Sequence, residues 1–250
     1  VDRLRCPSGP AQDRGVPGDV GGLDGLVPSL DGPELKPDEH EAFCQPPVSA
    51  IRGTLFEHRT HALETSLAVG VHGLPLIGTG DWNDGLNRVG IGGKGESIWL
   101  GWFLHAALSR FASLAERRGE KTLSENWREH AAKIGEALER DGWDGTWYRR
   151  AYFDDGTPLG SHGDAECRID SIAQSWAVIS GAAETSHAPS AMAAVNEPLV
   201  SPDDELVKIF PPPFNPTPHD PGHIHTHPPA LPPTGEPSPH HADPARLPRV

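Results

Sequence analysis

The sequence predicts a mainly helical protein whose helices are separated by long glycine-rich loops. Three observations favour this all-α class. Apolar residues recur at helical spacing in several segments, nine glycines lie between residues 70 and 95, and no alternating apolar–polar run is long enough for a large sheet. Hydrophobic residues make up 36% of the 250 residues, which is enough for the core of one or two domains.

Three helices are expected in the first half of the chain. The first spans 49–69, because Ser49 is a suitable N-cap and leucines follow at helical spacing. The second spans 96–119, and its first half is apolar nearly all round, which is typical of a helix buried on several sides. The third, at 124–140, mixes acidic and basic residues. Turns and short extended pieces are expected at 141–161.

Two shorter helices should follow, and the ends of the chain look irregular. A helix at 170–181 is stopped by Gly181, and a weaker one lies at 188–199. Residues 1–37 are rich in Gly, Pro and Asp and show no periodicity, so we expect a loop. Residues 211–250 hold 14 of the 27 prolines, so that segment cannot form a packed core of its own.

Charge and cysteine content exclude several classes of function. The chain has 21 basic and 35 acidic residues, a net charge of −14, which disfavours nucleic acid and anionic membranes as partners. The three cysteines (Cys6, Cys44 and Cys167) are widely spaced, so neither a zinc site nor a disulfide framework is indicated. A reducing cytosol is the simplest location. No run of about 18 apolar residues occurs, so no membrane contact is expected within the chain.

The stretch "GTGDWNDGLNRVG", Gly78 to Gly90, has two interpretations. It could be a turn capped by Asp and Asn side chains, with Trp82 as a core plug. It could also be a sugar site, because an indole stacks on the apolar face of a sugar while Asp and Asn bond its hydroxyls. A carboxyl held partly desolvated against an indole has a raised pKa and suits a general acid. The neighbouring "GIGGKG" at 90–95 fits a dinucleotide fingerprint, but a loop rather than a strand precedes it.

Several separate motifs resemble the catalytic domain of glycoside hydrolase family 94. "HGLPLIGTGDWNDGLNRVG" followed by "GESIWLGWFL" carries the resemblance most clearly. Three further segments agree with it: "WYRRAYFDDGTPLGS" (147–161), "ECRIDSIAQSWAVISG" (166–181) and "PPFNPTPHDPG" (212–222). The second of these is most similar to the branch of cyclic β-1,2-glucan synthases and β-1,2-oligoglucan phosphorylases.

This resemblance implies an (α/α)6 barrel and a phosphorolytic reaction. Only four or five of the twelve barrel helices are expected here, so we predict part of the barrel at 30–222. An irregular segment at 1–29 and a Pro/His-rich tail at 223–250 would flank it. The implied reaction is inverting phosphorolysis of a β-linked glucoside or oligoglucan to α-glucose 1-phosphate. Inorganic phosphate is the co-substrate, and no other cofactor or metal is implied.

The resemblance also places the site residues. It puts the general acid on Asp84 and a sugar-contacting indole on Trp82. Asp81 and Asn83 also lie in the substrate-binding loop, where we expect them to make loop-shaping hydrogen bonds.

Two more candidate substrate-binding residues, Arg168 and Gln174, lie in a motif close to the site. Their alternatives are an ion pair with a nearby acid for Arg168 and a helix-surface position for Gln174. Four other tryptophans are expected in the core: Trp99, Trp102, Trp143 and Trp176.

The chain departs from the family pattern after "HDPG". The family continues with a second "YPPG"-type turn and an "ENGG" stretch that help to bind phosphate and sugar, and a frameshift near Ile224 would explain their loss. We therefore expect the chain alone to be poorly packed and inactive. The parent could be a stand-alone phosphorylase, with a homodimer among its forms, or a membrane-bound multidomain synthase. The third alternative is a non-catalytic product that binds sugar, or metal through the tail histidines.

Overall fold

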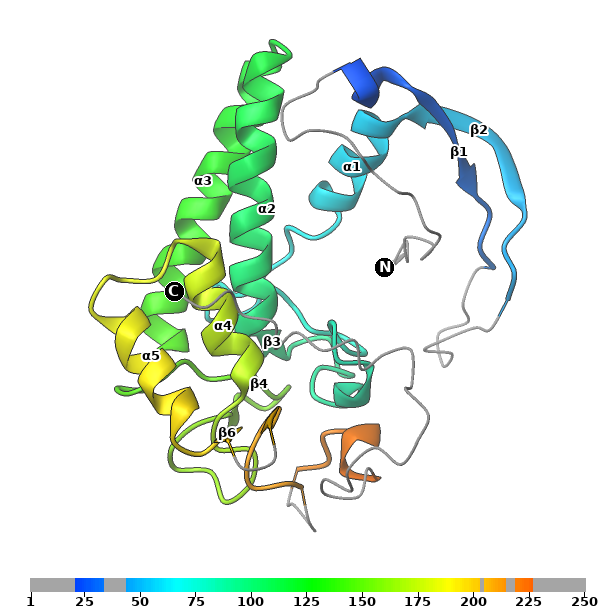
Figure 1. Ribbon diagram of the computed structural model, residues 1–250. Helices are drawn as coiled ribbons and strands as arrows, with labels where there is room; N and C mark the ends of the chain where they lie inside the picture. The colour runs from blue at the N-terminus through cyan, green and yellow to red at the C-terminus, as the bar shows by residue number, and fades with distance from the viewer. Residues whose placement is uncertain (1–20, 34–43, 203–204, 215–218, 227–250) are drawn as a thin grey trace. The chain divides into compact units, whose positions relative to one another are not determined.

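The computed structural model describes residues 21–33, 44–202, 205–214 and 219–226. By its internal contacts the chain forms two compact units. Figure 1 labels the helices and strands that make them up. Unit 1 comprises residues 1–68 and 106–132, and unit 2 comprises residues 69–105 and 133–250. The predicted boundaries at 29/30 and 222/223 follow other criteria and stay a prediction. Within the described ranges, none of the helices is long and apolar enough to cross a membrane.

The described part of unit 1 starts with the 3-10 turn η1 (Gly21–Asp24), which is followed by two antiparallel strands, β1 (Leu26–Leu30) and β2 (Val48–Thr54), and by helix α1 (Leu55–Glu64). The predicted helix at 49–69 is therefore too long at both ends, because residues 49–54 belong to β2 and α1 ends at Glu64. Thr54 is the true N-cap: its hydroxyl accepts from the Glu57 amide and the Glu57 carboxylate accepts from the Thr54 amide, which is a capping box. The loop prediction for 1–37 also missed β1, because most of its residues are exposed and leave no apolar alternation in the sequence.

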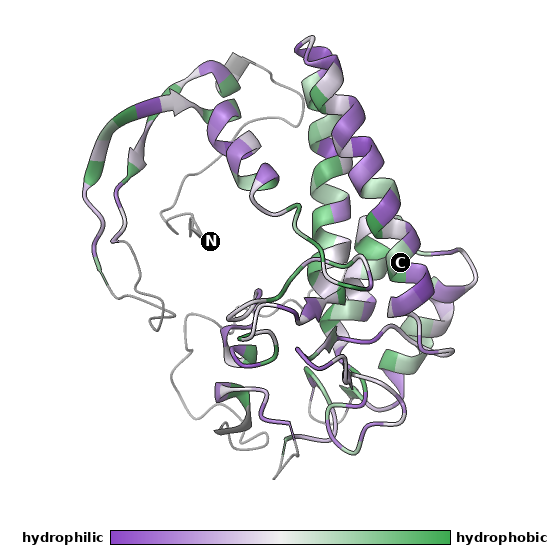
Figure 2. Cartoon of the chain, turned by 180° about the vertical axis from the view of Figure 1, so that it is seen from behind, coloured by the Kyte–Doolittle hydropathy of each residue, from purple (hydrophilic) through white to green (hydrophobic). Residues whose placement is uncertain are grey.

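Two long helices follow as predicted, α2 (Ile98–Arg117) and α3 (Lys121–Ala137), and they run side by side in Figures 1 and 2. Hydrophobic residues gather along α2, whereas α3 shows many hydrophilic ones (Figure 2). A π-helical turn, η3 (Leu138–Gly142), ends α3. Within unit 1 the Trp127 indole donates to the Glu64 carboxylate at 2.8 Å, which ties α3 to α1.

Unit 2 contains small sheets as well as helices, so the all-α prediction needs correction. Strands β3 (Glu96–Ser97), β4 (Ala151–Tyr152) and β5 (Pro158–Leu159) pair antiparallel in that order. Helices α4 (Ser171–Ser180) and α5 (His187–Asn196) follow, and then the strand pair β6 (Val200–Ser201) and β7 (Leu206–Val207). Strands of two residues are too short to show a period, which is why the sequence indicated only short extended pieces.

The end of α4 follows the expected signals. Asp170 caps its first turn, and Gly181 ends the helix in the left-handed conformation at φ 70°.

The core of unit 2 brings together segments that lie far apart in the sequence. One apolar cluster draws residues from the glycine-rich loop, the small sheet and the 210–214 segment: Ile77, Leu86, Val89, Ala151, Phe153, Leu159, Cys167 and Phe214. Two of the tryptophans expected in the core, Trp99 and Trp102, are buried. Trp143 and Trp176 are half-buried and contact other aromatic rings.

We predict that Gly160→Ala destabilises the protein more than Gly156→Ala. Both glycines have positive φ, +85° and +84°, so alanine carries a strain of about 1–2 kcal/mol at either position. Only at Gly160 would the new Cβ lie 2.6 Å from the Arg150 backbone nitrogen, which adds an overpacking cost of about 1–3 kcal/mol. Urea unfolding followed by tryptophan fluorescence measures the difference, and equal losses would contradict it.

Candidate active site

The loop from Gly78 to Gly90 is shaped by its own Asx side chains. The Asp81 carboxylate accepts from the Asn83 amide at 3.0 Å. The Asn83 side chain in turn accepts from the Gly85 amide at 3.0 Å and caps the 3-10 turn η2 (Asp84–Leu86). The loop-shaping hydrogen bonds expected of Asp81 and Asn83 are therefore present. Direct contact of either residue with a substrate stays a prediction.

A buried ion pair anchors this loop to strand β4. Two nitrogens of the Arg150 guanidinium donate to the two carboxylate oxygens of Asp81, each at 2.7 Å, and both side chains are 0% exposed. The Ser97 hydroxyl also donates to Asp81, at 2.6 Å. A bidentate pair of this kind fixes the orientation of the carboxylate as well as its position. Asp81 thus fixes the loop through its buried side chain.

The same arginine faces a second carboxylate, that of Asp170. Arg150 Nε lies 3.2 Å from Asp170 Oδ2 but makes no hydrogen bond with it. The other oxygen of Asp170 accepts from the Ile172 amide at the start of α4. One buried cation therefore joins the loop, β4 and α4. We call Arg150, Asp81, Asp170 and Ser97 the Arg150 cluster.

Burial and charge act differently on the two acids of the Arg150 cluster. Burial would raise the pKa of Asp81, but the Arg150 charge and the hydrogen bonds from Arg150, Ser97 and the Asn83 amide together hold this pKa below its usual value. Burial raises the pKa of Asp170. The Arg150 charge opposes this rise without offsetting it, and the like charge of Asp81 adds to it. The Arg150–Asp81 pair is thus the ionic core of the cluster.

Trp82 and Asp84, in contrast to Asp81, are exposed. The Trp82 side chain is 46% exposed, so the interpretation of this residue as a core plug is wrong. Asp84 is exposed at the start of η2. The partial burial expected for an acid against the indole is therefore not provided by the described residues. The loop therefore exposes an indole and a carboxyl to solvent, and its backbone is held in place by the buried Asp81 side chain.

Gln174 and Arg168 occupy contrasting places. Gln174 is fully buried on α4, where its amide accepts from the Tyr148 amide and donates to the Tyr148 carbonyl, so the helix-surface alternative is wrong. Arg168 is exposed and donates to the His162 carbonyl at 2.8 Å. Its contact among the described residues is thus a carbonyl, not the acid that we considered. Substrate binding by either residue stays a prediction.

The "HDPG" motif lies against the same loop. The Arg88 side chain pairs with Asp220 at 2.6 Å, the Arg88 amide donates to the Pro221 carbonyl, and the His223 amide donates to the Asn87 side chain at 2.9 Å. Segments more than 130 residues apart in the sequence meet here. The tail histidines from His227 on lie outside the described residues.

The structure also explains why "GIGGKG" is not a phosphate site. The Asp154 carboxylate accepts from the amides of Gly92, Lys94 and Gly95 at 2.6–2.9 Å. These are the backbone donors that a phosphate would use, and a carboxylate of the chain already takes them. Neither Asp154 nor Arg150 was singled out in the sequence, because Gly92 lies 62 residues from Asp154 and Asp81 lies 69 residues from Arg150.

We predict that Arg150→Met lowers the free energy of unfolding by about 3–5 kcal/mol, because it leaves the buried Asp81 charge uncompensated. The matched control is Arg88→Met, which removes an Arg–Asp pair whose side chains are 57% and 42% exposed. Exposed pairs contribute about 0–1 kcal/mol. Denaturant unfolding of both variants measures the contrast, and similar losses would show that burial does not decide the strength of the Arg150 pair.

We also predict that Asp81→Asn is far more destabilising at neutral pH than Asp170→Asn. The lowered pKa of Asp81 means that its ionised form stabilises the folded state, a contribution lost as pH falls through the folded-state value. The raised pKa of Asp170 means that its ionisation costs stability as pH rises through its folded-state value, and asparagine keeps the cap on α4 without that cost. Unfolding measured across pH tests both signs. A large loss in Asp170→Asn at neutral pH would contradict the assignment.

Comparison with known proteins agrees with these motifs. The family model described as "Glycosyl hydrolase 94 superfamily, catalytic domain" matches residues 35–241. Cyclic beta-(1,2)-glucan synthase NdvB of Rhizobium meliloti (strain 1021) is 46% identical over 206 residues, which are 82% of this chain and 7% of that protein. Solabiose phosphorylase of Paenibacillus borealis is 42% identical over 173 residues, 67% of this chain and 22% of that protein.

More distant relatives carry related names. Cellobionic acid phosphorylase of Neurospora crassa is 32% identical over 180 residues, 72% of this chain and 22% of that protein. The chain thus spans between 7% and 22% of the length of these three relatives. The family match covers most of the chain and includes the loop with Asp81, Trp82 and Asp84. This chain belongs to the glycosyl hydrolase 94 superfamily, as part of its catalytic domain.

Proposed function

We propose that this chain carries the acid-bearing part of an inverting glycoside phosphorylase site that acts on β-linked glucosides. The observation that carries the proposal is the arrangement of the loop from Gly78 to Gly90. Asp81 is buried and held by Arg150, while Trp82 and Asp84 are exposed on the same short stretch. An indole and a carboxyl presented together suit a sugar ring and its glycosidic oxygen.

In this proposal Asp84 is the general acid. It protonates the leaving glycosidic oxygen while inorganic phosphate attacks the anomeric carbon from the opposite face, and the product is α-glucose 1-phosphate. Phosphate is itself the nucleophile, so no second carboxylate is needed as a base, unlike in inverting hydrolases. Trp82 stacks on the sugar, and Arg168 and Gln174 support the site from the neighbouring motif. Gln174 does so through the backbone of Tyr148 rather than by direct contact.

A second candidate is a role inside a cyclic β-1,2-glucan synthase. The 46% identity to NdvB over 82% of this chain favours it, and the substrate would then be a linear β-1,2-glucan whose length this domain controls. The coding sequence before Val1 distinguishes the two candidates. Glycosyltransferase and membrane-spanning segments there indicate a synthase on the inner membrane, whereas their absence indicates a stand-alone cytosolic phosphorylase.

The decisive experiment places this sequence in a complete enzyme. We replace the matching segment of solabiose phosphorylase with the corresponding residues of this chain and measure phosphate-dependent cleavage of solabiose. Asp84→Asn should then lower kcat by about 10²–10⁴-fold, since general acid catalysis contributes about that much, with a much smaller change in KM. The control is Asp155→Asn, because Asp155 is a 56% exposed aspartate outside the loop and should tolerate the change.

Three outcomes would overturn parts of the proposal. Turnover that survives in Asp84→Asn but is lost in Asp81→Asn, in a folded variant, would move the acid to Asp81. Equal turnover without phosphate would mean hydrolysis. Full activity of the 250-residue chain alone would show that the phosphate-binding stretch missing after "HDPG" is dispensable.

A further inference from the structure

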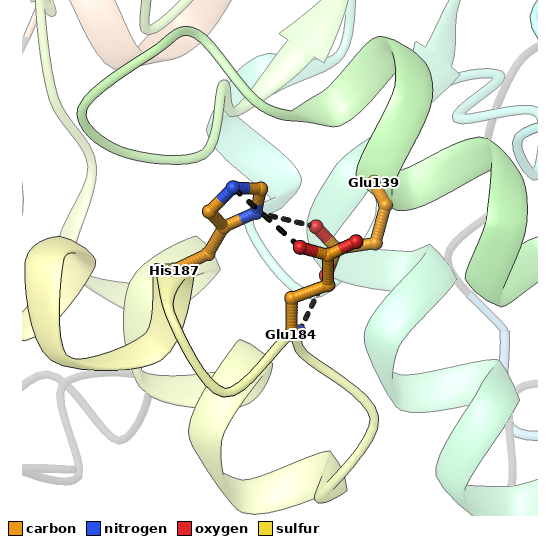
Figure 3. Close-up of side chains that lie close together, drawn as sticks. All are labelled: Glu139, Glu184 and His187. Carbon is orange, nitrogen blue, oxygen red and sulfur yellow. Dashed lines mark hydrogen bonds and ion pairs between the residues drawn. The ribbon is translucent and has the colours of Figure 1, made fainter.

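A second polar cluster in unit 2 lies outside the Arg150 cluster and takes no part in the proposed reaction. It comprises Glu139 in the π-helical turn η3, Glu184 in the α4–α5 connection and His187 at the start of α5 (Figure 3). One ligand atom from each of the three lies within 4.8 Å of the others. Glu184 and His187 are three residues apart, so both reach the same side of the α5 N-terminus.

The imidazole of His187 is held by contacts on two sides. Its Nδ1 lies 2.7 Å from Glu139 Oε2, and its ring stacks on the Trp143 indole with centroids 4.0 Å apart and an angle of 4°. The other oxygen of Glu139 accepts from the Tyr148 hydroxyl at 2.8 Å and from the Glu184 amide at 2.9 Å. The Tyr148 phenol is a donor to this oxygen, so the carboxylate accepts on both of its oxygens. Glu139 is thereby fixed as an acceptor for Nδ1–H.

This orientation leaves Nε2 of His187 facing a carboxylate. Nε2 lies 3.8 Å from Glu184 Oε2, and when Nδ1 carries the proton both of these atoms are acceptors. Two acceptors at this distance can share a donor or a cation between them, which can be a proton, a water molecule or a metal ion. Zn–N and Zn–O bonds are each about 2.0–2.2 Å, so ligands bridged by zinc are at most about 4.3 Å apart. The observed separation fits that limit.

We propose that Glu184 and His187 form a binding site for a first-row divalent metal ion such as Zn²⁺. His187 Nε2 and Glu184 Oε2 are the protein ligands, and water completes the coordination. Glu139 is the positioning residue, because a metal-bound histidine usually donates its other ring N–H to a carboxylate that sets its tautomer. Imidazole and carboxylate together suit zinc and its neighbours rather than calcium. The bound ion would join the α4–α5 connection to the start of α5, while the His187–Glu139 contact links α5 to η3, independently of the loop that carries Asp84.

The test uses the stack of His187 on Trp143. The 250-residue chain is titrated with Co²⁺ while tryptophan fluorescence is recorded, since a paramagnetic ion on Nε2 should quench the adjacent indole. A Trp143→Phe variant is titrated in parallel. Subtracting its signal removes the quench that comes from cobalt bound elsewhere, including at the tail histidines. We expect a saturable quench that excess Zn²⁺ reverses. Glu184→Gln should weaken the apparent affinity at least tenfold, and His187→Asn should abolish the Trp143 quench.

Glu184→Gln is the decisive variant, because this side chain is 59% exposed and its loss leaves the Glu139–His187 contact intact. The matched control is Glu136→Gln, an exposed glutamate on α3, which should bind cobalt as the parent does. A quench that His187→Asn removes but Glu184→Gln does not would show binding to the histidine alone. Absence of a Trp143 quench in the folded chain would show that no ion binds between the two side chains. Either result overturns the site.

Discussion

The ion pair between Arg150 and Asp81 is the interaction on which the rest of unit 2 depends. A fully buried guanidinium is costly unless carboxylates compensate it, and Arg150 is 0% exposed. It therefore draws Asp81 from the glycine-rich loop and Asp170 from the start of α4 to one point beside strand β4. Arg150 directly precedes strand β4, and its backbone amide donates to the Leu159 carbonyl while its carbonyl accepts from the Ile98 amide. Loop, sheet and two helices thus meet at one residue.

That anchor explains how so flexible a sequence can present fixed groups. The loop has little regular structure of its own, and its glycines cost conformational entropy on folding. The Asp81 carboxylate accepts from four donors, two on Arg150, one on Ser97 and the Asn83 amide, and the Asn83 side chain then accepts from the Gly85 amide next to Asp84. Reactive groups need to be held within a fraction of an ångström to act efficiently. The buried ion pair therefore holds the loop in a fixed position, as a helix or strand does for the residues of other sites.

Local signals predicted the helices well, whereas long-range pairing was not predictable. The apolar run in 96–119 and the Gly181 stop gave α2 and α4 with small errors, since both features act within a few residues. Residues 49–54 were predicted to be helical because β1, the strand partner of this segment, is mostly exposed and leaves no alternation to read. Arg150 stands 69 residues from Asp81, and no period links them. The family motif located Asp84 and Trp82, but only the structure shows that both are exposed while Asp81 is buried.

The exposure of Asp84 has a consequence for the proposed chemistry. A general acid works best where water is excluded, yet neither η2 nor the 219–226 segment buries this carboxyl. The Trp82 side chain is likewise 46% exposed. A sugar stacked on that indole would cover both groups at once, so desolvation would arrive with the substrate instead of being built into the fold. Binding energy from the sugar ring would then be spent on preparing the acid, and the buried Arg150–Asp81 pair would keep the backbone in place while that happens.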